Sequence, residues 1–177
     1  MDERRDRMPP EEGEKTARIR VYPDPVLIRK AMPVRNIDGK TKAVVDRMSE
    51  LMYANKGIGL AAPQVGISSR ILIVDVGQGL RAFINPEILE AEGEVVLEEG
   101  CLSLPGIEVP VKRKQKVLVR GRDMDGKEVN EEVFDFQARV YQHEIDHLNG
   151  TLIVHYLSSL KRGLLIKKMR KELERSP

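Results

Sequence analysis

The chain has 177 residues, of which 41% are hydrophobic and 33% charged, with a formal net charge of +2. This length favours one domain with a substantial core, and the small net charge gives no general argument for binding nucleic acid. No apolar run reaches the roughly 18 residues that span a bilayer. Cys101 is the single cysteine, which excludes an intrachain disulfide and favours a reducing, cytoplasmic compartment.

The first residues are expected to form a flexible charged tail. Residues 1–17 are dense in Asp, Glu, Lys and Arg and include Pro9-Pro10, a composition typical of mobile termini. The acidic residues and the lack of an apolar stretch argue against a signal peptide and a mitochondrial transit peptide. Residues 18–177 are expected to form a single domain.

An extended segment and a helix are expected next. Residues 19–33 combine apolar positions with prolines and are expected to lie extended on the body. Residues 41–55 have the apolar spacing of an amphipathic helix, and Lys56-Gly57 supplies its C-terminal stop. The apolar stripe of this helix consists of Val44, Met48, Leu51 and Met52.

The middle of the chain predicts strands, because short β-branched runs alternate with Gly, Asn and Pro signals. The expected strands cover residues 70–76, 80–84, 87–97, 107–111, 116–122 and 127–133. Asn85-Pro86 is expected to stop the second strand, and a turn at residues 123–126 joins the last two strands into a hairpin.

Two helices are expected at the end of the chain. Residues 136–148 return to helical period and end at Asn149-Gly150. A last helix over residues 157–173 places five apolar residues on one side: Leu157, Leu160, Leu164, Leu165 and Met169. The order of helix, several strands, helix and helix favours an α+β fold with an antiparallel or mixed sheet.

The segment His143-Glu144-Ile145-Asp146-His147 has the spacing of a metal site. Two histidines four residues apart leave the same face of a helix, so both imidazoles reach one ion. Glu144 can then direct its carboxylate at a water molecule rather than at the ion. The alternative is a solvated helix face that carries these residues by chance. Two of only three histidines at this spacing around a glutamate favour the metal site.

A catalytic metal site needs a third ligand, and Cys101 is the first candidate. A lone cysteine is usually a small buried hydrophobe. Cys101, however, lies between Glu-Glu-Gly and a Pro-Gly pair, which predicts a loop or strand end. A Cys-His-His set leaves the fourth position open, as catalytic sites do. His155 is the competing ligand, although it lies beyond the Gly150 stop and cannot continue the helix face.

A third segment, residues 57–66, is rich in small residues. Its Gly-x-Gly does not follow a strand and lacks a Gly-Lys-Ser/Thr ending, which excludes a phosphate-binding loop. Small residues allow the backbone to approach an extended peptide closely and to pair with it. Gln64 adds a neutral amide donor.

Three segments together resemble the peptide deformylase family: Gly57-Ile58-Gly59-Leu60-Ala61-Ala62-Pro63-Gln64, Glu99-Gly100-Cys101-Leu102-Ser103 and His143-Glu144-Ile145-Asp146-His147. They occur in the family order with family-like spacing, and the resemblance extends over about residues 18–173. The chain departs from the family in its tail and near Ile153 and His155, where many relatives have a Phe and an Asp. The resemblance implies sheets packed around a central metal-binding His-Glu-x-x-His helix, with a C-terminal helix.

The resemblance implies an enzyme. Similar proteins are metal-dependent hydrolases that remove the N-formyl group from the formylmethionine of newly made polypeptides and release formate. The implied metal ligands are Cys101, His143 and His147, with Fe²⁺ as the native ion and Zn²⁺, Ni²⁺ or Co²⁺ as substitutes. Glu144 is the implied general base and then general acid.

The resemblance also implies how substrate is held. The oxyanion donors are the side-chain amide of Gln64 and the backbone N–H of Leu102. The peptide is expected to add as a strand with the backbone of Gly59 among its partners. The candidates for the methionine pocket are Ile58, Leu97, Phe136 and Val140. For each of them, ordinary packing in the core is an equally good explanation of its apolar side chain.

The partners follow from this activity and from one charged segment. Residues 161–175 carry many Lys and Arg against Glu172 and Glu174, which indicates either a solvated helix face or contact with ribosomal RNA. No DNA or membrane partner is expected. Two rival functions have weaker support. A zinc endopeptidase would need a further metal ligand downstream of the histidines, and the sequence offers no suitable one. A binding module stabilised by a structural metal would need four protein ligands, and the sequence offers three.

Overall fold

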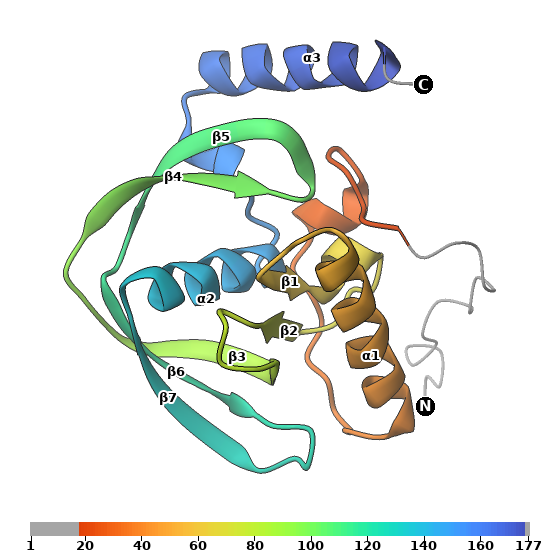
Figure 1. Cartoon of the computed structure of the whole chain (residues 1–177), viewed down its shortest axis with the longest axis vertical. Helices are drawn as coiled ribbons and strands as arrows, with labels where there is room; N and C mark the ends of the chain where they lie inside the picture. The colour runs from red at the N-terminus through yellow and green to blue at the C-terminus, as the bar shows by residue number, and fades with distance from the viewer. Residues whose placement is uncertain (1–17, 176–177) are drawn as a thin grey trace, which may run out of the picture.

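Residues 18–175 are described by a computed structural model (Figure 1). They form helices α1 to α3 and two antiparallel sheets, which agrees with the expected α+β class. None of these helices is long and apolar enough to cross a membrane. The tail expected at residues 1–17, like residues 176–177, lies outside the described part of the chain.

The larger sheet is antiparallel, with strand order β1-β2-β3-β6-β7. Its strands are β1 (Gly59–Ala61), β2 (Ile71–Val74), β3 (Arg81–Glu92), β6 (Lys116–Arg122) and β7 (Glu128–Phe134). The expected β6–β7 hairpin is confirmed. Its turn forms because the Asp123 carboxylate accepts the N–H groups of Asp125 and Lys127, both at 2.9 Å.

The prediction that Asn85-Pro86 ends a strand is wrong. β3 continues through the pair to Glu92, and its register against β6 shifts there. Asn85 has a left-handed φ of 52°, and its side chain bonds the N–H and C=O of Val34, both at 2.8 Å. A bulge accommodates a proline without an N–H to donate, so the strand bends instead of ending.

The second sheet is a long hairpin. It consists of β4 (Val95–Cys101) and β5 (Leu104–Arg113), with a register shift between Gly100 and Cys101. The single element expected over residues 87–97 is therefore also wrong. The chain turns at Gly93, whose φ of 65° favours glycine, and this turn separates β3 from β4.

Three α-helices within the described residues complete the fold: α1 (Gly39–Ala54), α2 (Asp135–Leu148) and α3 (Ser159–Arg175). In Figure 1, α2 lies between the larger sheet and the β4–β5 hairpin, while α3 lies beyond β5. α1 begins at a capping box, where the Asp38 carboxylate accepts the N–H groups of Lys40 and Thr41 at 2.9 and 3.1 Å.

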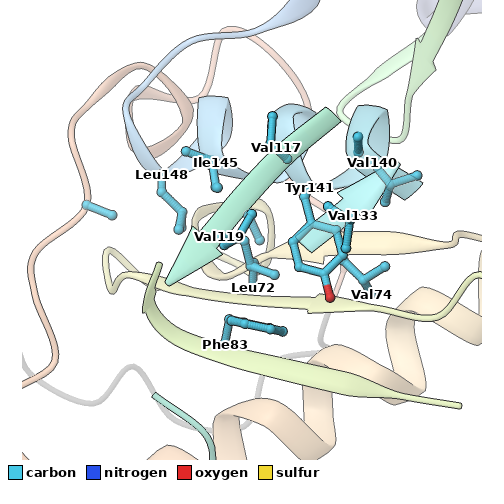
Figure 2. Close-up of a cluster of buried hydrophobic side chains, with 13 residues drawn as sticks. Leu72, Val74, Phe83, Val117, Val119, Val133, Val140, Tyr141, Ile145 and Leu148 are labelled. Atoms are coloured by element: carbon cyan, nitrogen blue, oxygen red, sulfur yellow. The ribbon is translucent and has the colours of Figure 1, made fainter. Parts of the chain in front are cut away.

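The main core lies between α2 and the larger sheet (Figure 2). Tyr141 of α2 meets Phe83 of β3 edge-to-face, with ring centroids 5.3 Å apart. Ile145 and Leu148 continue this buried face of the helix. Because one face of α2 is buried against the sheet, its opposite face is directed toward the β4–β5 hairpin.

The expected apolar side of the last helix is partly wrong. Leu160 and Leu164 are 74% and 61% exposed, whereas Ile166 and Met169 are buried against β5 and the 3₁₀ turn η3 (Ile153–Tyr156). Positions 166 and 169 are neighbours on one helical stripe. Because α3 lies against the surface along this stripe, with Leu165 partly buried at its side, Leu160 and Leu164 remain in solvent.

The N-terminal segment lies on the body as expected, with one 3₁₀ turn, η1 (Pro25–Ile28). Its backbone contacts two of the three motif segments and the residue that follows the third. Arg20 N–H donates to Gln64 O at 2.7 Å, Tyr22 N–H donates to Ser103 O at 3.0 Å, and Ala31 N–H donates to Leu148 O at 2.9 Å. The N-terminal segment therefore bonds to each of the elements that carry the candidate site.

Candidate metal centre

α2 presents the two histidines on one face. His143 and His147 lie one turn apart, with ring centroids 5.0 Å apart. The helix ends immediately after them, where Gly150 adopts a φ of 74°. A side chain on Gly150 would lie 2.8 Å from the backbone carbon of Ile28, so a close approach also requires glycine there.

Cys101 approaches these histidines from the end of β4. Its Sγ lies 3.3 Å from Nε2 of His147, and the candidate ligand atoms of Cys101, His143 and His147 all lie within 4.8 Å of one another. The register shift beside Gly100 turns the strand at this point. The structure therefore brings together the three residues that the sequence predicted as ligands.

A carboxylate holds the first histidine from behind. Nδ1 of His143 lies 2.9 Å from Oε2 of Glu99, which leaves Nε2 for a ligand. Burial opposes ionisation of Glu99, but the bonds from Arg113 and His143 outweigh it and lower its pKa to about 2. Burial likewise lowers the pKa of His143, but its bonds with Cys101 and Glu99 outweigh this and raise it. The contacts outweigh burial in both groups: Glu99 stays negatively charged and His143 more readily carries a positive charge. The surroundings of His143 therefore favour a cation.

The second histidine and the glutamate between the pair have unpaired atoms. Nδ1 of His147 and Oε2 of Glu144 are buried and have no hydrogen-bond partner among the described residues. Burial and the nearby His143 lower the pKa of His147, which favours the neutral form that binds metals. Burial, with a contribution from Glu99, raises the pKa of Glu144 to about 7. A thiol, two imidazoles and an unpaired carboxylate fit a divalent cation with an open coordination position.

Glu144 also contacts the strand that carries the small-residue motif. A Cβ built on Gly59 would lie 2.5 Å from Oε1 of Glu144, so no larger residue fits beside the carboxylate as it stands. Ile58, the preceding residue, is 41% exposed.

The amide of Gln64 has a defined orientation. Gln64 lies in the 3₁₀ turn η2 (Ala62–Val65), and its Oε1 accepts the N–H of Ala61, the residue before this turn, at 2.9 Å. Nε2 therefore faces the site, where it lies 3.2 Å from Oγ of Ser103 and 3.8 Å from Sγ of Cys101. Leu102 follows Cys101 in the turn between β4 and β5.

The candidate pocket residues divide into two groups. Leu97 and Phe136 are 51% and 57% exposed, and Ile58 is also exposed. Val140 is buried in the core beside Val133 and Tyr141 (Figure 2), which favours the packing interpretation for this residue. The three exposed residues lie on β4, on α2 and beside β1, the elements that carry Cys101, His143 and Gly59.

The structure separates the competing ligand from the site. Nδ1 of His155, a residue of η3, accepts the N–H of Leu152 at 2.9 Å, and Leu152 is the residue that caps the start of this turn. This imidazole therefore closes a turn, and Cys101 rather than His155 joins the pair of histidines.

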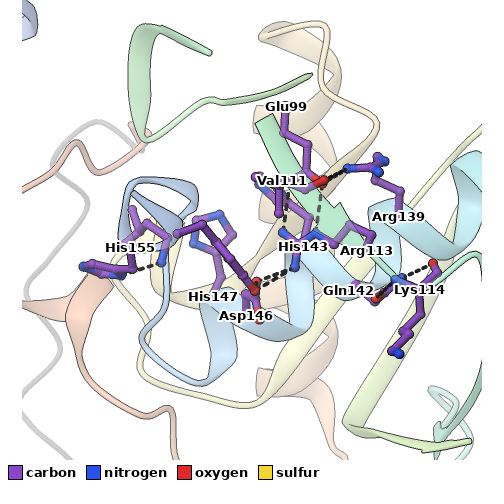
Figure 3. Close-up of polar contacts among 12 residues, drawn as sticks. Glu99, Val111, Arg113, Lys114, Arg139, Gln142, His143, Asp146, His147 and His155 are labelled. Atoms are coloured by element: carbon purple, nitrogen blue, oxygen red, sulfur yellow. Dashed lines mark hydrogen bonds and ion pairs between the residues drawn. The ribbon is translucent and has the colours of Figure 1, made fainter. Parts of the chain in front are cut away.

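Sequence reasoning missed the charged residues behind His143. Glu99 accepts Nε of Arg113 at 2.9 Å and Nη1 of Arg139 at 2.5 Å (Figure 3). Arg139 precedes His143 by four residues on the same helix, a spacing that is visible in the sequence. Arg113 comes from β5, and no sequence signal connects it to the site.

Comparisons with known proteins agree in one family. Residues 16–163 match the Polypeptide deformylase family. The peptide deformylase of Thermodesulfovibrio yellowstonii is 48% identical over 157 residues, which are 86% of this chain and 95% of that protein. That of Thermotoga maritima is 52% identical over 153 residues, covering 86% of this chain and 93% of that protein.

Solved structures give the same result. A peptide deformylase from Legionella pneumophila matches with a TM-score of 0.85 and 38% identity, over 92% of this chain and 100% of that chain. The enzyme from Ehrlichia chaffeensis in complex with actinonin matches with a TM-score of 0.86 and 40% identity, over 90% and 98% of the two chains.

Proposed function

This chain belongs to the polypeptide deformylase family of enzymes, and from that premise we propose that it removes the formyl group from N-terminal formylmethionine of newly made polypeptides. The proposal includes a divalent cation held by Cys101, His143 and His147. The observation that carries it is the approach of these three ligand atoms to within 4.8 Å of one another, beside the buried carboxylate of Glu144.

Glu144 moves the proton in this reaction. A bound divalent cation supplies Lewis acidity, which lowers the pKa of water and polarises the formyl carbonyl. Glu144 takes the proton of the attacking water at Oε2, the atom without a partner among the described residues. It then gives this proton to the departing amine, a transfer favoured by a pKa near neutrality.

Gln64 and Leu102 stabilise the oxyanion that forms on the formyl oxygen. The fixed amide of Gln64 directs Nε2 toward the site, so it needs no reorientation during the reaction. The backbone N–H of Leu102 is the second donor. A neutral amide suits this position because a carboxylate would repel the developing negative charge.

The peptide binds as an additional strand. β1 is the end strand of the larger sheet, and Gly59 lies on it beside Glu144. An end strand offers backbone groups to an incoming chain. The methionine side chain is held by exposed apolar residues of the neighbouring elements, for which Ile58, Leu97 and Phe136 are the candidates, whereas Val140 is a weaker candidate because it is buried in the core.

The native cation is Fe²⁺ in this proposal, with Zn²⁺, Ni²⁺ and Co²⁺ as substitutes, because thiolate and imidazole ligands suit all four ions. Iron bound to a thiolate is sensitive to oxygen, so the iron form should lose activity in air as Cys101 oxidises. The enzyme acts in the cytoplasm, where chains are made and where a single free thiol stays reduced.

α3 is the proposed contact with the ribosome. Lys161, Lys167 and Lys171 are exposed on it, while Ile166 and Met169 anchor the helix. Replacing these three lysines by Glu should weaken binding to ribosomes without changing formate release from a free tripeptide, because the phosphate contacts are electrostatic. Unchanged ribosome binding would leave α3 as a solvated helix face.

The decisive assay is formate release from formyl-Met-Ala-Ser. Protein purified without oxygen and loaded with Fe²⁺, Ni²⁺ or Zn²⁺ should be active, while Glu144→Ala should be inactive and still bind the ion. Cys101→Ala should lose both activity and tight binding. Wild type that binds an ion, releases no formate with any of the three and cleaves casein would instead be an endopeptidase.

A further inference from the structure

A series of charged groups extends to the surface from the Nδ1 side of the His143 imidazole, where that nitrogen meets Glu99. Glu99 binds His143 at one end, and Arg113 binds both oxygens of Glu99, each at 2.9 Å. The side chains of Arg113 and Glu99 are 4% and 5% exposed, so this pair is held in a region of low dielectric.

Asp146 and Tyr156 continue this series outward. Nη1 of Arg113 donates to Oδ2 of Asp146 at 2.5 Å and to the hydroxyl of Tyr156 at 3.1 Å. The Tyr156 hydroxyl donates in turn to the same Asp146 oxygen at 2.7 Å. The guanidinium carbon lies 5.1 Å from the centroid of the Tyr156 ring, so the ring supports the cation as well. Arg113 is therefore held from two directions.

The charges in this cluster balance. Two carboxylates, Glu99 and Asp146, face two guanidiniums, Arg113 and Arg139, and all four groups contact one another in series. Loss of the Asp146 charge would leave a net positive charge behind His143. This positive charge would repel a divalent cation on the other side of the His143 imidazole. The repulsion is stronger because the cluster lies in a region of low dielectric.

We propose that Asp146 and Tyr156 are positioning residues for the metal centre, acting through Arg113 and Glu99 on His143. Asp146 supplies the negative charge that balances the positive charges of the cluster, and the Tyr156 hydroxyl holds the Asp146 carboxylate toward Arg113. This keeps the guanidinium paired with both oxygens of Glu99, and hence keeps Nε2 of His143 directed at the ion. The proposal rests on the metal centre of the proposed function.

The test is the affinity of the full chain, freed of metal, for Co²⁺, measured by competition with a chromophoric chelator. Asp146→Asn and Tyr156→Phe should weaken binding toward the low end of the ~10–100-fold range found for outer partners of ligating histidines. Both should also shift the visible absorption bands of bound Co²⁺, which report ligand geometry. Tyr53→Phe is the matched control, because its hydroxyl makes a similar 2.7 Å bond to Asp75 at the surface. It should bind Co²⁺ as wild type does.

The outcomes separate the two proposals. Equal affinity and equal spectra for wild type and Tyr156→Phe would overturn the positioning role while leaving the metal centre intact. Wild type that binds no Co²⁺ would overturn both. The melting temperature of each metal-free variant identifies a folding defect. If Asp146→Asn fails to fold, Tyr156→Phe decides the question, because it removes only the hydroxyl and keeps the ring beside the Arg113 guanidinium.

Discussion

Gly59 and Glu144 are in such close contact that a single methyl group on Gly59 would lie 2.5 Å from the carboxylate oxygen Oε1. This contact joins the end strand of the larger sheet to the proposed general base. The position of the carboxylate therefore depends on the smallest possible side chain opposite it.

Gly59→Ala should lower kcat/KM for formyl-Met-Ala-Ser by about 100-fold, because an added methyl displaces Glu144 and a ~1 Å misplacement costs that much. Co²⁺ affinity should change little, since the ligands themselves are not displaced. Gly39→Ala is the control, because nothing lies within 4 Å of a Cβ at that position. Full activity in Gly59→Ala would show that Glu144 relaxes without cost.

Glu99→Gln should destabilise the fold by about 3–5 kcal/mol, because it removes the carboxylate that pairs with the buried guanidinium of Arg139 and leaves Arg113 with Asp146 alone. The measurement is urea unfolding of the metal-free protein at neutral pH. Glu87→Gln breaks a carboxylate–arginine pair with Arg120 at the surface and should cost less than about 1 kcal/mol. Similar losses in both variants would contradict the burial argument.

Asp38 should make the stability of α1 depend on pH. The N–H of Thr41 and that of Lys40 hold the pKa of Asp38 below its ordinary value of 3.8. A lowered folded-state pKa means that the carboxylate stabilises the fold above the unfolded-state pKa and loses this effect as the pH falls through the folded-state value. The stability difference between wild type and Asp38→Ala should therefore shrink between pH ~5 and ~3. A difference that stays constant over this range would rule out the titration of Asp38 as its source.

Removal of the cation should lower the melting temperature of the wild type. A ligand that binds only the folded state at 1,000 times its Kd stabilises by about 4 kcal/mol. Scanning calorimetry with and without chelator measures this shift. Cys101→Ser and His147→Ala should show a much smaller shift, whereas His155→Ala should keep the full one because His155 only closes a turn. A full shift in Cys101→Ser would remove the thiolate from the ligand set.

The sequence predicted the elements that depend on residues close together in the chain. α2, α1 and the β6–β7 hairpin occur within one or two residues of their expected bounds. The two histidines four residues apart did occupy one face of a helix. Cys101 was expected in a loop or at the end of a strand, and it is the last residue of β4.

Predictions from the sequence were wrong where a feature depends on which other element packs against it. Asn85-Pro86 reads as a stop, yet β3 continues, because Val34 satisfies the Asn85 side chain and β6 accepts a bulge. Leu160 and Leu164 fit a helical stripe, yet they are exposed, because the side of α3 that packs against β5 is the one that carries Ile166 and Met169.

Helical and strand periodicity, turn chemistry and the spacing of the histidines are local properties, so the sequence by itself determined most elements and the family to which they belong. Only the tertiary structure decided how the charges pair. Glu99 meets Arg113 across 14 residues and Arg139 across 40, and nothing in the sequence pairs either arginine with Glu99. The physical reason is that a buried carboxylate is stable only with opposite charges beside it, and packing of β4, β5 and α2 decides which residues supply them.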